Sequence, residues 1–322
     1  MAEEIIPNIF RITVPLPRNP LKFLNSYVLC GEERSLVVDT GLNRPECLEA
    51  LQQGLGSLGL DPEKTDIFIT HMHSDHSGLA PEMSSRGARV FASATDAAII
   101  NDRTDWSELM RFAWACGLPE DKLLEARDKH PGYKYRPTGQ VHFSHVADGD
   151  VLDLGGYRLR CLHTPGHTAG HICLYEPEKK LFLAGDHILE EITPNISQWR
   201  EGINPLGDYL HSLDKVSDLQ VELVLPGHRR LFADFKGRIA TLKAHHERRL
   251  QEVLGLLDAQ PQTPYSIASQ MSWDMSYASW EDFPMAQKWF ASGEALAHLS
   301  LLESRGEISR RMENGRLAFV RS

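Results

Sequence analysis

Four metal-ligand-type side chains stand within six consecutive residues, in the run His71-Met72-His73-Ser74-Asp75-His76. The apolar residues before this run indicate a β-strand, in which alternate side chains point to the same face. His71 and His73 can therefore chelate one ion. If the chain turns after His73, Asp75 and His76 point to a neighbouring position for a second ion. Imidazole and carboxylate ligands together suit zinc, with iron or manganese as alternatives.

The same local pattern, a short apolar strand that ends in a polar turn, recurs along about the first 230 residues. It occurs in the five segments SLVVDTG (35–41), DIFITHMHSDH (66–76), RLRCLHTPGH (158–167), KLFLAGD (180–186) and VELVLPGH (221–228). Helical stretches such as residues 44–59 lie between them, and this alternation indicates an α/β fold. If the strands run in one parallel layer, their ends converge at one edge, where sheet enzymes gather their chemistry.

Two ions need more ligands than the first cluster provides, and the later strand ends supply His167, Asp186 and His228. Asp186 is the natural bridge, because a carboxylate has two oxygens and its charge offsets part of the repulsion between two cations. A hydrogen-bonded turn histidine is the alternative role for His167 or His228 taken alone. Their position after a cluster that needs partners favours ligation.

In order and spacing, the segments VVDTG, THMHSDH, HTPGHTAGH, LAGD and LPGH resemble the metallo-β-lactamase superfamily, over roughly Ile5 to Phe232. The resemblance implies a four-layer αβ/βα sandwich with two zinc ions at the edge between its two sheets. By the family pattern, one ion takes His71, His73, His167 and Asp186, and the other takes Asp75, His76, His228 and the shared Asp186. Asp39 would then orient a ligand histidine or the metal-bound water through a hydrogen bond, with a simple turn carboxylate as the alternative.

Two features of the sequence narrow the expected reaction within this superfamily. The segment HTPGHTAGHICLYE is similar to the glyoxalase II branch, whereas the tail resembles the winged-helix extension of thioesterase-like and endoribonuclease-like members. Secreted β-lactamases of the superfamily usually carry a signal peptide and often a cysteine at the position of Asp186, which disfavours antibiotic hydrolysis.

We therefore expect a dinuclear zinc hydrolase in which a metal-bridging hydroxide cleaves a thioester or ester bond of a small molecule. A thiolate leaves without a proton donor, whereas an amide nitrogen requires one. Asp75 or His187 could serve as that donor. The expected catalytic residues are Asp75, Asp186 and His187.

The chain pattern changes to long helical stretches near residue 235, so we expect a catalytic domain at 1–234 and a small helical domain at 235–322. Two short strand candidates near the end are joined by an Asn-Gly turn at Asn314 and Gly315. A helix followed by such a hairpin suggests a winged helix. This keeps a phosphodiesterase or endoribonuclease on the same metal pair as an alternative function, and a non-enzymatic metal-dependent binding protein as a second one.

Charge argues against nucleic acid as the partner. The net charge is -10, and the residues from Lys236 onward are nearly neutral. Four arginines cluster in the tail, at Arg310, Arg311, Arg316 and Arg321. A solvated hairpin or a homodimer contact explains this cluster better than a nucleic-acid surface does.

The composition also indicates in which cellular compartment the protein is expected. Hydrophobic residues make up 42% and charged residues 24%, which is typical of a globular protein. No apolar run reaches the roughly 18 residues of a membrane span, and the N-terminus is acidic where a signal peptide carries basic residues. The five cysteines form no C-x-x-C pair and fit a reducing compartment. We expect a cytoplasmic protein.

Overall fold

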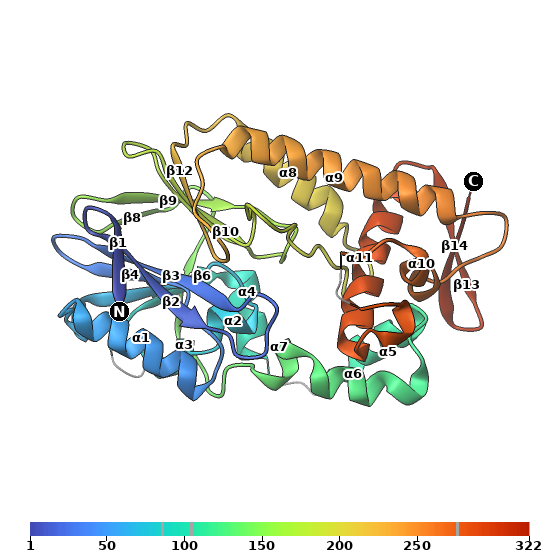
Figure 1. The fold of residues 1–322 in the computed structure, drawn as a ribbon, viewed down its shortest axis with the longest axis horizontal. Helices are drawn as coiled ribbons and strands as arrows, with labels where there is room; N and C mark the ends of the chain where they lie inside the picture. Colours follow the sequence, from blue (N-terminus) through green and yellow to red (C-terminus); the bar gives the residue numbers. More distant parts are fainter. Residues whose placement is uncertain (85–86, 103–105, 275–276, 322) are drawn as a thin grey trace. The chain divides into compact units, whose positions relative to one another are not determined.

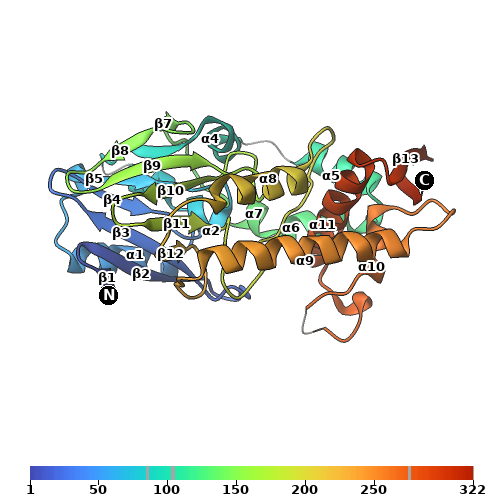
Figure 2. The same ribbon diagram turned by 90° about the horizontal axis from the view of Figure 1, so that it is seen from above.

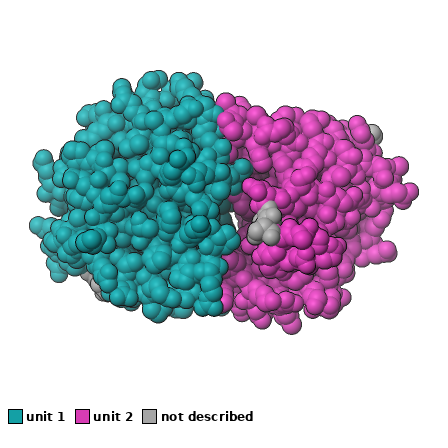
Figure 3. All heavy atoms as spheres, viewed as in Figure 1, with its two compact units in different colours: residues 1–102, 135–194, 212–239 teal, residues 103–134, 195–211, 240–322 magenta. Residues whose placement is uncertain are grey.

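The computed structural model describes residues 1–84, 87–102, 106–274 and 277–321. The chain forms two compact units, which Figure 3 colours separately. The first unit comprises residues 1–102, 135–194 and 212–239, and the second comprises residues 103–134, 195–211 and 240–322.

The first unit contains two β-sheets, which Figures 1 and 2 show as separate layers. The larger sheet consists, in spatial order, of β1 (Ala2–Ile6), β2 (Ile9–Pro15), β3 (Phe23–Cys30), β4 (Ser35–Val38), β5 (Thr65–Phe68), β6 (Val90–Ser93) and β7 (Phe143–Val146). Strands β1 to β4 pair in antiparallel fashion, and β4 to β7 pair in parallel. The predicted alternation of strands and helices therefore lies in the second half of this sheet.

The smaller sheet consists, in spatial order, of β12 (Leu223–Pro226), β11 (Leu181–Gly185), β10 (Ile172–Glu176), β9 (Arg158–His163) and β8 (Val151–Asp153). Strand β10 runs antiparallel to both of its neighbours, and β11 pairs with β12 in parallel. Strands β9, β11 and β12 therefore run in the same direction, so that their carboxyl ends reach the same edge of the sheet.

Apolar side chains fill the space between the two sheets. Val38 and Phe68 of the larger sheet pack in one buried cluster with Leu174 and Leu183 of the smaller sheet. A second cluster joins the other face of the larger sheet to α1 (Pro45–Ser57), α3 (Ala80–Ser84) and α4 (Ala94–Asn101). The start of α9 (Phe235–Leu256) packs on the smaller sheet, where the Phe235 and Phe182 rings lie 5.0 Å apart. These layers confirm the predicted αβ/βα fold.

Helix α1 shows how the sequence sets one of these layers. Pro45 occupies the first helical turn, where its missing N–H is not needed, and Leu51 is completely buried. A Cβ atom at Gly54 would lie 2.6 Å from the Cδ1 atom of Ile12. Glycine at this position therefore allows the helix to lie directly on β2.

The second unit is mainly helical. Its helices are α5 (Ser107–Ala115), α6 (Leu123–Lys129), α7 (Pro131–Lys134), α10 (Pro264–Gln270) and α11 (Met285–Ser304), while α8 (Pro205–Ser217) and α9 have residues in both units. Short 3-10 helices occupy Glu120–Lys122 and Trp280–Asp282 in this unit, and Pro62–Lys64 in the first unit. Leu118 and Trp289 belong to the buried core of this unit. Among the residues described, we find no helix long and apolar enough to cross a membrane.

The chain ends in a hairpin of β13 (Ile308–Glu313) and β14 (Arg316–Arg321). Glu313 pairs with Arg316, and the two residues between them, Asn314 and Gly315, have φ values of 50° and 76°. Positive φ at both positions is what a two-residue hairpin turn of type I′ requires. The predicted Asn-Gly turn is confirmed, and the comparison with a winged helix stays a prediction.

Candidate metal centre

The five chemistry-bearing segments all end strands of the first unit, as predicted. Strands β4 and β5 precede Asp39 and His71, whereas β9, β11 and β12 precede His167, Asp186 and His228. The expectation of one parallel layer is wrong, because the first two strands belong to the larger sheet and the other three to the smaller sheet. The ligand-type residues meet nevertheless, since the carboxyl ends of these strands lie at a common edge of the sandwich.

The seven predicted metal ligands come together in three overlapping groups. Within each group the candidate ligand atoms lie within 4.8 Å of one another. The groups are His71, His73 and His167; His71, His76 and Asp186; and Asp75, His76 and His228. The first and third groups share no residue, and the second connects them.

The run from His71 to His76 supplies members of all three groups because the chain turns within it. The helix α2 (Ser74–Ser77) begins directly after His73, which has extended backbone angles of φ -60° and ψ 143°. The rings of His71 and His73 lie 4.8 Å apart, and those of His73 and His167 lie 4.5 Å apart. Asp75 and His76 lie on α2 and face His228 instead, with 3.4 Å between Asp75 Oδ2 and His228 Nε2. The turn expected after His73 is therefore present.

Asp186 lies between the first and third groups. Its Oδ1 atom is 3.6 Å from Nε2 of His76, and its Oδ2 atom is 3.7 Å from Nε2 of His167 and 3.5 Å from Nε2 of His228. Both carboxylate oxygens thus face imidazole nitrogens from different parts of the chain. This arrangement is the one that a bridging carboxylate needs.

In this cluster, burial and neighbouring carboxylates shift the pKa values of the histidines in opposite directions. Burial lowers the pKa of His73 to about 3, so that this ring is neutral and offers a lone pair. Burial would also lower the pKa of His228, but the carboxylates of Asp186 and Asp75 raise it to about 10. These two carboxylates therefore favour a positive charge beside His228, because buried charges in proteins are paired or bind metals.

The hydrogen bonding of His71 also fits a metal ligand. Within the described part of the chain, the buried Nε2 atom of His71 has no hydrogen-bond partner. Its Nδ1 atom is occupied, because it lies 3.0 Å from the hydroxyl of Thr70. An imidazole held through one nitrogen, with the other turned toward further histidines, is the usual arrangement of a metal ligand.

The strand β3 supports the loop that carries His228. Asn25 Nδ2 donates to the carbonyl of Pro226 at 3.0 Å, and the Tyr27 hydroxyl donates to the same carbonyl at 2.9 Å. His228 Nδ1 lies 2.9 Å from the carbonyl of Phe23. Asn25 and Tyr27 are strand residues, and their side chains also fix the position of a predicted ligand.

We expect Gly227→Ala to weaken metal binding while the chain still folds. A Cβ atom at this position would lie 2.7 Å from Asp186 Oδ1 and 2.8 Å from Cε1 of His76, so at least one of these side chains must move. The metal dissociation constant, measured by chelator competition, should rise by about tenfold or more. Gly56→Ala is the matched control, because a Cβ at Gly56 meets nothing within 4 Å. Equal metal affinities in the two variants would contradict the prediction.

Sequence reasoning missed Asp96, which holds two of the loops together. Its carboxylate accepts hydrogen bonds from the backbone N–H of Met72 at 2.9 Å, the hydroxyl of Thr168 at 2.6 Å and the N–H of Gly170 at 2.9 Å. The local signal was a helix cap, since the Ser93 hydroxyl accepts from the Asp96 N–H at the start of α4. A helix start of this kind gives no sign that the Asp96 carboxylate also holds two loops.

His171 was also missed, although it stands in the segment that contains His167. It is completely buried, and its ring stacks on that of His71 at 5.1 Å. Its Nε2 atom accepts from the backbone N–H of Asp186 at 3.2 Å, and its Nδ1 atom lies 2.9 Å from the hydroxyl of Thr164. The four-residue spacing from His167 was the available signal.

His187 lies outside the three groups. It is completely buried, its ring lies 6.1 Å from that of His171, and burial lowers its pKa to about 3. At neutral pH this ring is therefore uncharged. Its predicted catalytic role stays a prediction.

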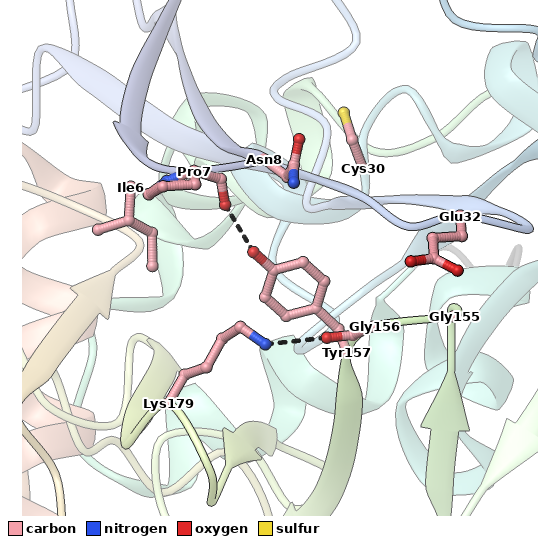
Figure 4. Close-up of a pocket in the computed structure, with 9 residues that line it drawn as sticks. All are labelled: Ile6, Pro7, Asn8, Cys30, Glu32, Gly155, Gly156, Tyr157 and Lys179. Atoms are coloured by element: carbon pink, nitrogen blue, oxygen red, sulfur yellow. Dashed lines mark hydrogen bonds between the residues drawn. The ribbon is translucent and has the colours of Figure 1, made fainter.

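A hollow of about 300 Å³ lies elsewhere in the first unit (Figure 4). Two of its polar side chains are paired within the protein, since the Tyr157 hydroxyl donates to the carbonyl of Pro7 and Lys179 Nζ donates to the carbonyl of Gly156. Lys179 also lies 4.4 Å from the centre of the Tyr157 ring. None of the predicted metal ligands is among the residues that line this hollow.

Two family models match the chain. The model of the metallo-beta-lactamase superfamily matches residues 20–228, which include all seven predicted ligands. The model described as the metallo-beta-lactamase-like C-terminal domain matches residues 250–322.

Solved structures with the same fold include two that cover nearly the whole chain. A metallo-beta-lactamase family protein from Thermus thermophilus is 33% identical, with a TM-score of 0.82, and the match covers 99% of this chain and all of that one. A beta-lactamase domain protein from Burkholderia ambifaria is 26% identical, with a TM-score of 0.84, and the match covers 100% and 94% of the two chains.

Curated relatives include proteins named as hydrolases. A probable metallo-hydrolase, YqjP of Bacillus subtilis, is 24% identical over 307 residues, covering 91% of this chain and 92% of YqjP. An atrochrysone carboxyl ACP thioesterase of Claviceps purpurea is 26% identical over 258 residues, covering 79% of this chain. The match spans 66% of that thioesterase, just under two thirds of its length.

Proposed function

This chain belongs to the metallo-beta-lactamase superfamily, and we propose that it is a hydrolase that uses two metal ions to cleave a thioester or ester bond. One observation carries the proposal, namely the place of the Asp186 carboxylate, whose Oδ2 atom lies near Nε2 of both His167 and His228 and whose Oδ1 atom lies near Nε2 of His76. A carboxylate so placed can serve two neighbouring ions at once.

The proposed ligand sets follow the groups. His71, His73 and His167 would hold one ion, Asp75, His76 and His228 would hold the other, and Asp186 would contact both. We propose zinc, because imidazole and carboxylate ligands suit it, and iron or manganese accept the same ligand types. Such ions supply Lewis-acid chemistry, since they make water a nucleophile at neutral pH and polarise a carbonyl oxygen.

The protein groups around the ions would position water and handle protons. Asp75 is the more exposed of the two ligand carboxylates, with 16% of its side chain exposed against 8% for Asp186. Burial alone would raise the pKa of Asp75, but the hydrogen bond from His228 and the charge of His76 hold it well below its usual value, so this carboxylate would not carry a proton for the leaving group. A thiolate leaving group, with a pKa of about 8.5, would not require that proton. This chemistry favours thioesters and esters over amides.

The names of the relatives support an acyl-thioester substrate. Two relatives are named as a thioesterase and a metallo-hydrolase, and we extend the first activity to this chain as a proposal. We likewise propose a catalytic domain at 1–234 and a C-terminal domain at 235–322, of which residues 240–322 form one compact unit together with residues 103–134 and 195–211. This division is supported by family models that match residues 20–228 and 250–322.

The tail arginines argue against the phosphodiesterase alternative. Arg310 is paired with Glu303 at 2.7 Å. Arg316 donates to the backbone carbonyls of Trp114 and Leu118 and stacks on the Trp114 ring at 4.2 Å. Two of the four clustered arginines are thus engaged within the second unit, which leaves Arg311 and Arg321 exposed. That is a small charge for a nucleic-acid surface.

A metal analysis combined with a substrate panel tests the proposal. We expect two transition-metal ions per chain and turnover of acyl-thioesters or of the ester bond of a lactone, with little turnover of a β-lactam or a bis-aryl phosphodiester. Loss of turnover after chelation, and its return with zinc, would tie the activity to the ions. Two ions with only phosphodiester turnover would favour the nuclease. Absence of metal and of turnover would contradict the hydrolase and favour a binding protein.

A further inference from the structure

One carboxylate touches both halves of the candidate metal centre. Asp39 is 2% exposed and directly follows β4, with a left-handed φ of 63° that non-glycine residues seldom adopt. Its Oδ1 atom accepts the backbone N–H of Thr70 at 2.8 Å. Its Oδ2 atom lies 2.8 Å from the hydroxyl of Thr70 and 2.7 Å from Nδ1 of His76. The carboxylate is therefore held from the end of β5 and from α2 at once.

The Thr70 hydroxyl extends this contact to a second histidine. It lies 3.0 Å from Nδ1 of His71, in addition to its contact with Asp39. A hydroxyl has one proton, and an ionised carboxylate only accepts, so the proton of Thr70 points to Asp39. The lone pair of the hydroxyl then accepts the Nδ1 proton of His71. This direction leaves the lone pair of His71 on Nε2, the atom that faces the other histidines.

His76 is oriented in the same way from the other side. Its Nδ1–H donates to Asp39 Oδ2, which leaves Nε2 directed at Asp186 and His228. The connected atoms thus run from His71 through Thr70 and Asp39 to His76. His71 belongs to the group with His73 and His167, and His76 to the group with Asp75 and His228.

We propose that the Thr70 hydroxyl is a positioning group that fixes the tautomer of His71 and, through Asp39, links one ligand of each metal ion to a shared hydrogen-bonded support. The inference rests on the proposed two-metal function. Thr70 itself contacts no ion in this arrangement. It acts only through two hydrogen bonds. One keeps the proton of His71 on Nδ1, and the other keeps the Asp39 carboxylate in place, so that it contacts His76 directly and His71 through the hydroxyl.

The hydroxyl can be tested by substitutions that change little else. Thr70→Val removes the hydroxyl and keeps the branched shape, whereas Thr70→Ser keeps the hydroxyl. Thr40→Val is the matched control, because Thr40 is also completely buried and its hydroxyl donates to the backbone carbonyl of His76 at 2.8 Å, with no imidazole contact. If Thr70→Val does not fold, Thr70→Ala removes the same hydroxyl without adding a methyl group in its place.

We would measure stepwise zinc dissociation constants of the full chain by chelator competition, and imidazole protonation by proton-nitrogen NMR of the zinc-loaded protein. We expect Thr70→Val to weaken one of the two zinc-binding steps by about 10- to 100-fold and to disturb the Nδ1–H signal of His71. Thr70→Ser should stay within about threefold of the parent in both steps, as should Thr40→Val.

The outcomes separate this inference from the proposed function. A parent protein that binds fewer than two zinc ions would overturn the two-metal proposal, and the inference with it. Two tightly bound ions in the parent, with unchanged affinities and His71 signal in Thr70→Val, would overturn the inference alone. The same would follow if Thr40→Val weakened zinc as much as Thr70→Val, since the effect would then be one of general packing.

Discussion

Asp186→Ala is expected to lose at least one of two bound metal ions and to reduce hydrolysis by on the order of 10³-fold or more. The side chain faces His76 through one oxygen and His167 and His228 through the other. Its removal takes a ligand from both proposed ion positions and negative charge from a buried site. Both losses act in the same direction, so we expect no compensation from the remaining residues.

Elemental analysis of the variant, run beside the parent on the same thioester substrate, would measure both effects. Asp186→Asn sharpens the test, because it keeps the shape of the side chain and removes its charge. Asp153→Ala is a control at a carboxylate whose side chain is 63% exposed. Unchanged metal content and turnover in Asp186→Ala would show that this carboxylate does not bridge.

The ligand residues were predictable because their signals are local. Each stands at the end of a strand whose apolar residues are continuous in the sequence, and His71, His73 and Asp75 follow one another at spacings that suit chelation. The turn at Asn314 and Gly315 was predictable for the same reason, since two residues determine its geometry. Such features can be recognised without knowing which segments of the chain contact each other in the fold.

The supporting residues were not predictable, because their partners are distant in the chain. In the sequence Asp96 resembles an ordinary acidic residue in the first turn of a helix, and its bonds to Thr168 and Gly170 appear only when two loops meet. Thr70 is one more residue of a strand end until Asp39 lies beside it. The grouping of residues 103–134 and 195–211 with the C-terminal segment is another long-range result. No local pattern in those stretches indicates which part of the chain they pack against.

We expect Asp66→Ala to lower the free energy of unfolding by about 2 kcal/mol, because it removes a buried carboxylate that accepts charge-assisted hydrogen bonds from two arginines, which are 27% and 54% exposed. The Asp66 side chain is 1% exposed and contacts Arg34 Nε at 2.7 Å and Arg89 Nη2 at 2.5 Å. Arg34 precedes β4 and Arg89 precedes β6, while Asp66 lies in β5. One carboxylate thus joins three neighbouring strands at their amino ends, opposite to the strand ends that carry the metal ligands.

The loss of stability in Asp66→Ala should decrease as the pH falls. Burial alone would raise the pKa of Asp66, but the hydrogen bonds from Arg34 and Arg89 hold it below its usual value. A carboxylate whose pKa is lowered by folding stabilises the protein above its unfolded pKa of about 4, and this contribution is lost as the pH falls through the lowered value. Parent and variant should therefore differ most near neutral pH and converge in acid.

Urea unfolding of the full chain at several pH values would measure this difference. Glu3→Ala is the comparison for an exposed pair, since Glu3 is 59% exposed and contacts Arg11, and we expect a loss of no more than about 1 kcal/mol. Asp66→Ala should keep the metal content of the parent, because its side chain contacts none of the proposed ligands in the described structure. A variant as stable as the parent at neutral pH would mean that the two arginines are as well satisfied by water as by the carboxylate.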